Sequence, residues 1–151
     1  MSEQYNIRLA MPKDKEELER LTRELVKEKG ERFVEKRYEW GILRRVYDPL
    51  QRHGIFVAES NDDDKLVGMI FGELRVDPYG VTECYIKQTF VESAHRNKSI
   101  GFNLLKRIIE HLKNIDVKKI KLNLEIDDKK FKEMLEEFKF KPKYTVMELK
   151  L

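Results

Sequence analysis

The chain is poor in the features that mark disulfide-rich, membrane-spanning or exported proteins. Cys84 is its only cysteine, which excludes an internal disulfide and a cysteine-based zinc cluster. No apolar run approaches the roughly 18 residues that cross a bilayer, and residues 1–4 show neither an apolar signal core nor an arginine-rich transit pattern. We therefore expect a soluble, cytoplasmic protein without a membrane partner.

The chain also lacks an excess of charge of one sign. It contains 31 lysines and arginines against 28 aspartates and glutamates, for a net charge of +3, and the two signs are interleaved. A nucleic-acid-binding domain gathers its basic residues in a stripe, so this pattern argues against a nucleic-acid partner. Apolar residues make up 40% of the 151 residues and recur in periodic segments, which predicts a single globular domain over residues 1–151.

The spacing of apolar residues predicts a mixed α/β chain. Strict alternation is typical of strands, and recurrence every three or four residues is typical of helices. The expected order is β-α-α-β-β-β-α-β-α-β, an α+β mixed sheet covered by helices. The segment 33–47 has too many aromatic and aliphatic residues for one helical stripe, so it faces either a ligand, a partner or a broad core contact. Strands are expected at 5–9, 55–58, 66–76, 81–91, 120–126 and 147–151, and helices at 13–29, 33–47, 100–114 and 131–138.

The most informative segment is the turn between the strand that ends at Val91 and the helix that begins at Ile100. The first N–H groups of a helix have no intrahelical partner and carry partial positive charge, so they favour an anion. Arg96 and Lys98 add full positive charges, and Gly101 lets a ligand approach the backbone without meeting a Cβ. The turn predicts a diphosphate site, although an exposed basic turn without function explains the same residues.

This turn resembles the acetyl-CoA-binding motif of the GCN5-related N-acetyltransferase (GNAT) superfamily, in which a strand ending in Val leads to Arg/Gln-x-x-Gly-x-Gly/Ala and a helix. Arg96, Ile100 and Gly101 match this motif, and Ser99 stands where the first glycine is usual. The order of elements resembles the GNAT fold over nearly the whole chain. The resemblance implies acetyl-CoA as the acyl donor, and it implies a role in binding this donor for Phe90, Val91, Arg96, Asn97, Lys98, Ser99, Ile100, Gly101 and Asp128.

The catalytic half of the resemblance is weaker. Histone-acetyltransferase members place a glutamate on the strand before the turn, and here Tyr85 has that position. Glu83 lies on the same face of the strand and is our candidate base, the alternative being a solvated carboxylate at the start of a strand. Glu73 and Glu125 are further candidates. Many members also have a tyrosine that assists the leaving thiolate, but here Leu135 replaces it, so Tyr144, Tyr85 or a water substitutes, or the thiolate leaves unassisted.

The sequence therefore predicts an N-acetyltransferase that moves an acetyl group from acetyl-CoA directly to a primary amine, without a metal. The acceptor is a small molecule or a protein amine, bound over residues 33–47 and the strand ends near Glu83. The departures at Ser99, Tyr85 and Leu135 support an alternative, a GNAT-fold protein that binds an acyl-CoA as a sensor or partner domain without catalysis. Edge strands and the aromatic-rich segment are compatible with a homodimer.

Overall fold

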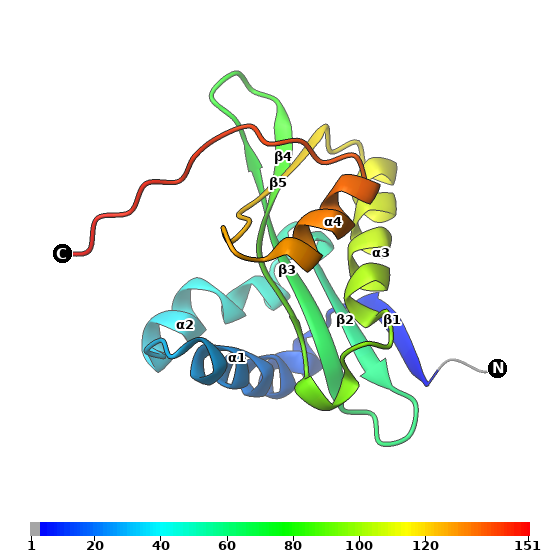
Figure 1. Cartoon of the computed structure of the whole chain (residues 1–151). Coiled ribbons are helices and arrows are strands. Elements are labelled where there is room, and N and C mark those ends of the chain that lie inside the picture. Colours follow the sequence, from blue (N-terminus) through cyan, green and yellow to red (C-terminus); the bar gives the residue numbers. More distant parts are fainter. Residues whose placement is uncertain (1–3) are drawn as a thin grey trace. The chain divides into compact units, whose positions relative to one another are not determined.

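The structure is a computed structural model that describes residues 4–151, so residues 1–3 of the predicted domain lie outside the described residues. The chain forms two compact units, one that ends at Lys121 and one from Leu122 to Leu151. None of the helices in the described part of the chain has the length and apolar character of a membrane-crossing segment. Figure 1 shows the elements, which are β1 (Tyr5–Leu9), α1 (Lys15–Lys29), α2 (Glu35–Gly41), β2 (Ile55–Ser60), β3 (Leu66–Val76), β4 (Thr82–Val91), α3 (Ile100–Asn114), β5 (Lys119–Leu122) and α4 (Lys129–Glu137).

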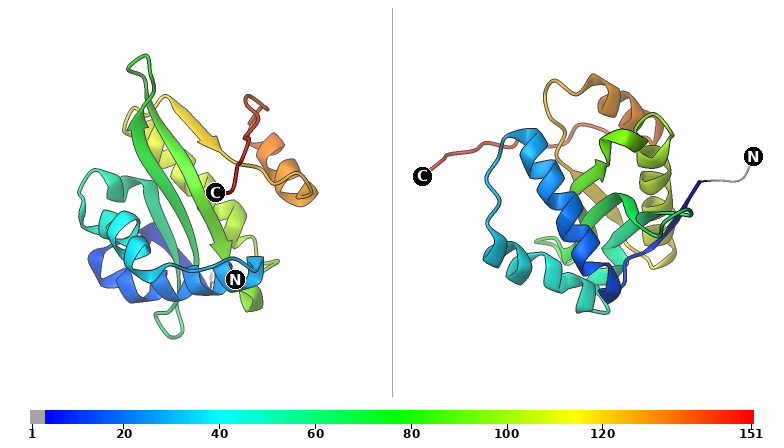
Figure 2. Two further views of the ribbon diagram at one scale, coloured as in Figure 1. Left: turned by 90° about the vertical axis from the view of Figure 1, so that its left-hand side faces the viewer. Right: turned by 90° about the horizontal axis from the view of Figure 1, so that it is seen from below.

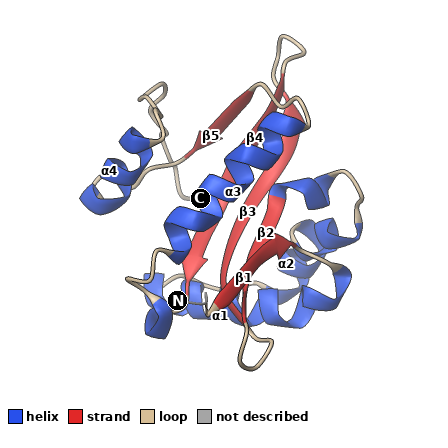
Figure 3. Ribbon diagram, turned by 90° about the vertical axis from the view of Figure 1, so that its right-hand side faces the viewer, coloured by secondary structure: helices blue, strands red, loops and turns tan. Residues whose placement is uncertain are grey.

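Five strands form one sheet in the order β1-β2-β3-β4-β5 (Figure 3). The first four are antiparallel neighbours: short turns join β2 to β3 and β3 to β4, whereas residues 10–54, with α1 and α2, connect β1 to β2. The helix α3 carries the chain from β4 to β5, the kind of crossover that joins parallel strands. The predicted mixed sheet is therefore confirmed.

Helices cover both faces of the sheet, with α1 and α2 on one face and α3 on the other (Figure 2). The sheet can support two layers because β3 is apolar on both sides over its first half. Met69 and Phe71 belong to the core cluster that contains the α1 leucines, while Ile70 points to the opposite face. The α3 side chains Ile100, Leu104, Leu105, Ile108 and Leu112 are all fully buried.

Backbone packs directly on backbone at Gly72 of β3. A Cβ at this position would lie 2.5 Å from the Sγ atom of Cys84 and 3.1 Å from the carbonyl oxygen of Gly54. A Cβ at Gly54 would in turn collide with the carbonyl group of Gly72. Gly54 ends the short 3-10 helix η3 (Gln51–Gly54), so this contact seats η3 against the centre of the sheet.

A β-bulge interrupts the pairing of β3 with β4 at the same point. Phe71 pairs with Gln88 and Gly72 pairs with Ile86, which leaves Lys87 as the extra residue on β4. The extra residue shifts the alternation, so Phe90 packs on the α1 side of the sheet although Cys84 and Ile86 face α3. A glycine inside a strand, as at Gly72, is a sequence sign of a bulge or of close packing, and both occur here, although the extra residue lies on β4.

Most of the expected elements differ from the structure in their bounds, and four of these differences affect the site or the sheet. The helix expected at 33–47 is divided: α2 spans Glu35–Gly41, and after Ile42 the chain continues as the 3-10 helix η2 (Leu43–Tyr47). The strand expected at 81–91 begins one residue later, and that expected at 120–126 spans only Lys119–Leu122. The closing strand expected at 147–151 is wrong, since residues 141–151 have no regular secondary structure.

Candidate functional site

The turn that follows β4 has an unusual backbone. After the short 3-10 helix η4 (Ser93–His95), Asn97 and Ser99 have φ angles of 67° and 61°, and Ser99 leads directly into α3. The left-handed region disfavours a residue with a Cβ by about 1–2 kcal/mol. The glycine that is usual in the GNAT-like motif would adopt this conformation without strain, so Ser99 retains the backbone shape of the motif at an energetic cost.

Two arginines fix the turn to the rest of the fold. The Nε atom of Arg96 donates to the Val91 carbonyl oxygen at 3.0 Å, and its Nη2 atom contacts Glu28 of α1 at 2.6 Å. Arg20 of α1 contacts Glu92 at 2.6 Å, one residue beyond β4. Arg96 therefore holds the turn against β4 and α1, and Glu28 partly balances the full positive charge that the sequence indicates.

The residues of the turn fit an anionic diphosphate. Asn97, Lys98 and Ser99 are exposed, and the 15-residue helix α3 aims its first N–H groups at them. A Cβ at Gly101 would meet only the Val91 side chain, at an ordinary distance of 3.8 Å. The described residues around Gly101 thus leave room for a small side chain at this position. Packing within the protein does not require a glycine here, so the open space beside Gly101 is available to a ligand.

Glu83 lies at the centre of an ion-pair cluster on the α1 side of the sheet. Its side chain is only 2% exposed and contacts Arg75 at 2.6 Å, Lys121 at 3.0 Å and Lys119 at 3.8 Å. Burial raises the pKa of Glu83, but the hydrogen bonds from Arg75 and Lys121 outweigh it and hold the pKa below its usual range. The alternative interpretation of Glu83 as a solvated carboxylate is therefore wrong. A role as base requires that Glu83 release one of these partners.

The other predicted catalytic and donor-binding residues have distinct surroundings. Tyr85 is half-buried with the Arg75 guanidinium 4.5 Å from its ring. Phe90 is buried in the core cluster and Val91 is half-buried at the end of β4. In the C-terminal unit, Tyr144 is 71% exposed, and Asp128 accepts a hydrogen bond from the Phe131 N–H at 3.0 Å as the N-cap of α4.

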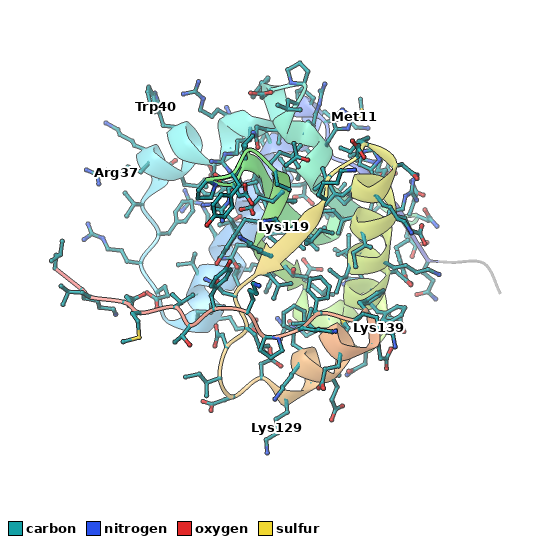
Figure 4. All side chains as sticks on the ribbon, turned by 90° about the horizontal axis from the view of Figure 1, so that it is seen from above. Met11, Arg37, Trp40, Lys119, Lys129 and Lys139 are labelled. Atoms are coloured by element: carbon teal, nitrogen blue, oxygen red, sulfur yellow. The ribbon has the colours of Figure 1, made fainter. Side chains whose placement is uncertain are left out.

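A cavity of about 610 Å³ lies beside η2. Trp40, which is 76% exposed, forms one wall and projects outward from α2 (Figure 4). The Arg44 guanidinium lies 5.0 Å from the Trp40 ring, a cation–π contact. The surplus of aromatic residues in 33–47 was the sequence signal for this surface. The lining residues are Trp40, Gly41, Arg44, Arg45, Tyr47, Asp48 and Gln51.

Glu73 connects this cavity with the bulge of β4. The Nη2 atom of Arg45, a lining residue, contacts Glu73 Oε2 at 2.5 Å, and the Nζ atom of Lys87 lies 3.8 Å from the same oxygen. Burial raises the pKa of Glu73, and the hydrogen bond and charge of Arg45 outweigh it, so the pKa lies below its usual range. This link was not predicted from the sequence. Its signal was the pair of polar residues Lys87 and Gln88, which interrupts the alternation of β4.

A group of acidic residues elsewhere offers the geometry of a cation site. One carboxylate oxygen from each of Glu19, Glu35 and Glu39 lies within 4.8 Å of the others. Arg23 contacts Glu19 at 3.3 Å and Glu35 at 3.5 Å, so neutralisation by arginine accounts for this group.

The family assignment follows from comparison with known proteins. The model of the acetyltransferase (GNAT) family matches residues 16–140, which is most of the chain. The chain belongs to the GNAT acetyltransferase family. The match includes the turn at 96–101, the bulge of β4 and the cavity beside η2, so the GNAT resemblance of the sequence is confirmed.

Solved structures show the same GNAT fold. The chain is 20% identical to the possible acetyltransferase of Clostridium difficile 630, with a TM-score of 0.73 and 99% of each chain covered. It is 17% identical to ribosomal-protein-alanine N-acetyltransferase from Brucella melitensis biovar Abortus 2308, with a TM-score of 0.70 and coverages of 97% and 99%. For glucosamine-6-phosphate N-acetyltransferase from Arabidopsis thaliana, the identity is 19%, the TM-score 0.69 and the coverages 98% and 99%. No curated protein matches the sequence.

Proposed function

We propose that this GNAT protein transfers an acetyl group from acetyl-CoA directly to a primary amine. The observation that carries the proposal is the turn at 96–101, where the positive φ of Ser99 and the open side of Gly101 present the N-terminus of α3 to an anion. Similar structures include proteins named for N-acetylation of a ribosomal-protein alanine and of glucosamine 6-phosphate. These acceptors differ in size, so the fold supports the reaction class and not one acceptor.

The charges around β4 suit this chemistry. As the amine nitrogen bonds to the thioester carbon, negative charge develops on the carbonyl oxygen, and the breaking C–S bond releases a thiolate. Positive surroundings stabilise both anions and favour the neutral, nucleophilic form of the acceptor amine. Among the described ion pairs of this face, five cations meet three carboxylates: Arg45, Arg75, Lys87, Lys119 and Lys121 against Glu73, Asp77 and Glu83.

We propose that the acceptor enters through the cavity beside η2 and meets the donor near the bulge of β4. Trp40 and Tyr47 offer aromatic surfaces at its rim, and Glu73 lies on the side toward Lys87. The Glu73 side chain is 20% exposed against 2% for Glu83, so Glu73 is the more accessible carboxylate for the proton that the amine loses. The catalytic roles of Glu83, Tyr85 and Tyr144 remain predictions from the sequence.

The decisive experiment on donor binding replaces Gly101 by glutamate. The Gly101→Glu variant should fold, since a Cβ there meets only Val91 at 3.8 Å and a carboxylate in the first turn of a helix is favourable. If a pyrophosphate rests on this backbone, the added carboxylate repels it, and calorimetric titration with coenzyme A should show affinity lowered by roughly tenfold or more. Gly41→Glu is the matched control, because a Cβ there meets no described atom within 4 Å. Unchanged affinity for Gly101→Glu would remove the turn from the site, whereas Gly101→Ala should bind normally because the motif accepts alanine at this position.

Catalysis is tested by thiol release from acetyl-CoA in the presence of amines and peptide N-termini. Glu73→Gln should lower kcat at least tenfold and leave the affinity for coenzyme A unchanged, because Glu73 lies toward the acceptor. Glu83→Gln should mainly lower thermal stability, since it leaves Arg75 and Lys121 without their buried partner. Binding of acetyl-CoA without thiol release for any amine would favour the sensor or partner domain instead.

A further inference from the structure

Arg44 lines the cavity beside η2 with its hydrogen-bond donors unused. Its guanidinium lies 5.0 Å from the Trp40 ring, and no hydrogen bond or ion pair joins its side chain to another residue between 4 and 121. Contact with a ring occupies the face of a guanidinium, so the N–H groups in its plane stay free to donate. Two such N–H groups fit two oxygens of a carboxylate or phosphate. Trp40 thus holds Arg44 in a position to bind an oxyanion.

Arg45, the next residue of η2, has an unused donor as well. Its Nη2 atom contacts Glu73 at 2.5 Å, but its Nη1 atom is buried and has no hydrogen-bond partner among residues 4–121. A buried donor without a partner is unfavourable and rare in native proteins, so each instance calls for an explanation. An oxyanion bound in the cavity would give this nitrogen an acceptor.

The other polar side chains of the cavity wall are engaged in the fold. Asp48 is the one carboxylate among the described lining residues, and its Oδ1 atom accepts hydrogen bonds from the N–H groups of Leu50 at 2.8 Å and of Gln51 at 3.2 Å. The Gln51 side chain donates to the Leu74 carbonyl oxygen at 2.9 Å and accepts from the Leu74 N–H at 3.0 Å. The charged groups with donors left for a ligand are therefore the two arginines.

From these contacts we propose that the acceptor is a small primary amine that also carries a carboxylate or a phosphate, which Arg44 and Arg45 bind. The proposal rests on the acetyl transfer proposed above and names its substrate class. Arg45 contacts Glu73 through one nitrogen and leaves the other for the anion, so the amine and the anion would bind at two ends of one guanidinium group. This arrangement favours a compact acceptor. A polyamine carries only positive charges, which the arginines repel.

Matched pairs of acceptors test the substrate class. O-phosphoethanolamine against ethanolamine, and β-alanine against its amide, change the anionic group and keep the primary amine. In assays of thiol release, KM should be at least tenfold lower for the anionic member of a pair, with a smaller change in kcat, because the anion is bound equally before and during the reaction. The pair with the larger KM ratio distinguishes phosphate from carboxylate. Equal KM values within both pairs would overturn the proposal.

Two variants connect this preference to the arginines. Arg44→Gln removes the charge beside Trp40, and Arg45→Lys keeps a cation for Glu73 but removes the second donor nitrogen. Each should bring the KM ratio of the pair closer to one. Arg37→Gln is the matched control and should keep the ratio, because Arg37 lies on the same helix as Trp40 but does not line the cavity (Figure 4). A ratio that survives both cavity variants would exclude the arginines as the anion site.

Calorimetry separates failure of this proposal from failure of acetyl transfer. Titration with the same four amines, in the presence of coenzyme A, measures acceptor binding without a reaction. Binding that depends on the anion, without thiol release, would refute the transfer reaction and support the anion site. Thiol release with equal binding of all four amines would refute the anion site alone. Absence of both binding and thiol release would refute both proposals.

Discussion

Ser99 has a backbone conformation that its residue type disfavours. Its φ of 61° lies in the left-handed region, and no side-chain hydrogen bond caps α3 there. The Ser99→Gly variant should raise the free energy of unfolding by about 0.5–1 kcal/mol, because relief of the left-handed strain exceeds the added entropy of the unfolded chain. Urea denaturation measures this change. Ser93→Gly, at an exposed position without positive φ, is the control and should not stabilise the protein.

Cys84 illustrates how burial controls the reactivity of one side chain. The Cys84 side chain is fully buried, and this burial raises the pKa of the thiol to about 12. The thiolate is the reactive form, so the native protein should not react with a disulfide reagent such as DTNB at pH 8. In guanidinium chloride one thiol per chain should react at once. Rapid labelling of the native protein would show that the sheet opens at this point.

At the scale of elements, a histidine pair joins η3 to α3. His53 Nδ1 and His111 Nε2 are 2.9 Å apart, and the ring centroids are separated by 5.1 Å. Such a hydrogen bond needs one ring as donor and the other as acceptor, so it is lost when both rings are protonated. Burial lowers the pKa of His111, and the charges of His53 and Arg107 lower it further.

This pair gives folding stability a predictable dependence on pH. Because the pKa of His111 is lower in the folded state than in the unfolded state, its contribution is complete above the unfolded value of about 6.5 and falls as the pH drops toward the folded value. Urea denaturation at pH 7.5 and pH 5.5 should show the loss. His111→Gln should reduce this difference, and His95→Gln, which changes the histidine outside the pair, should retain it. An equal pH effect in all three proteins would contradict the assignment.

The elements that could be predicted from the sequence are those in which a regular pattern of apolar residues runs from one end of the element to the other. The bounds of β1, β3 and α3 follow from alternation in the strands and the apolar stripe of the helix, and all three are confirmed. The division of 33–47 was missed because its excess of apolar residues hides the break at Gly41. Gly72 indicates a bulge or close packing from the sequence alone, but the extra residue Lys87 on the facing strand was not predictable, because a bulge is a property of two paired strands.

The candidate site was predictable to the same extent. The turn at 96–101 is a local motif, and its residues were identified from the sequence. The surroundings of Glu83 were not, because its cations come from the two neighbouring strands, Arg75 from β3 and Lys119 and Lys121 from β5. The connection from Arg45 through Glu73 to Lys87 likewise joins three elements that are distant in the sequence.

For the whole molecule, burial is distributed unevenly between the two units. Leu135 is the only buried apolar side chain of residues 122–151, whereas the first unit contains the core on both faces of the sheet. Segments with few buried apolar contacts open locally at low free-energy cost. Hydrogen exchange followed by mass spectrometry should therefore show α4 exchanging at least tenfold faster than β3 and β4. Equal protection would indicate that the chain unfolds as one cooperative body.

The packing of Gly54 against Gly72 determines which sequence changes the fold can accept. The two positions are 18 residues apart in the chain, yet each excludes a side chain at the other, so neither replacement can compensate for the other. In a saturation-mutagenesis library selected for soluble expression, both positions should be depleted of every substitution, including alanine. Engineers who shorten or graft the loop before β2 would have to preserve this point of contact, since it sets how closely any inserted segment can approach the sheet.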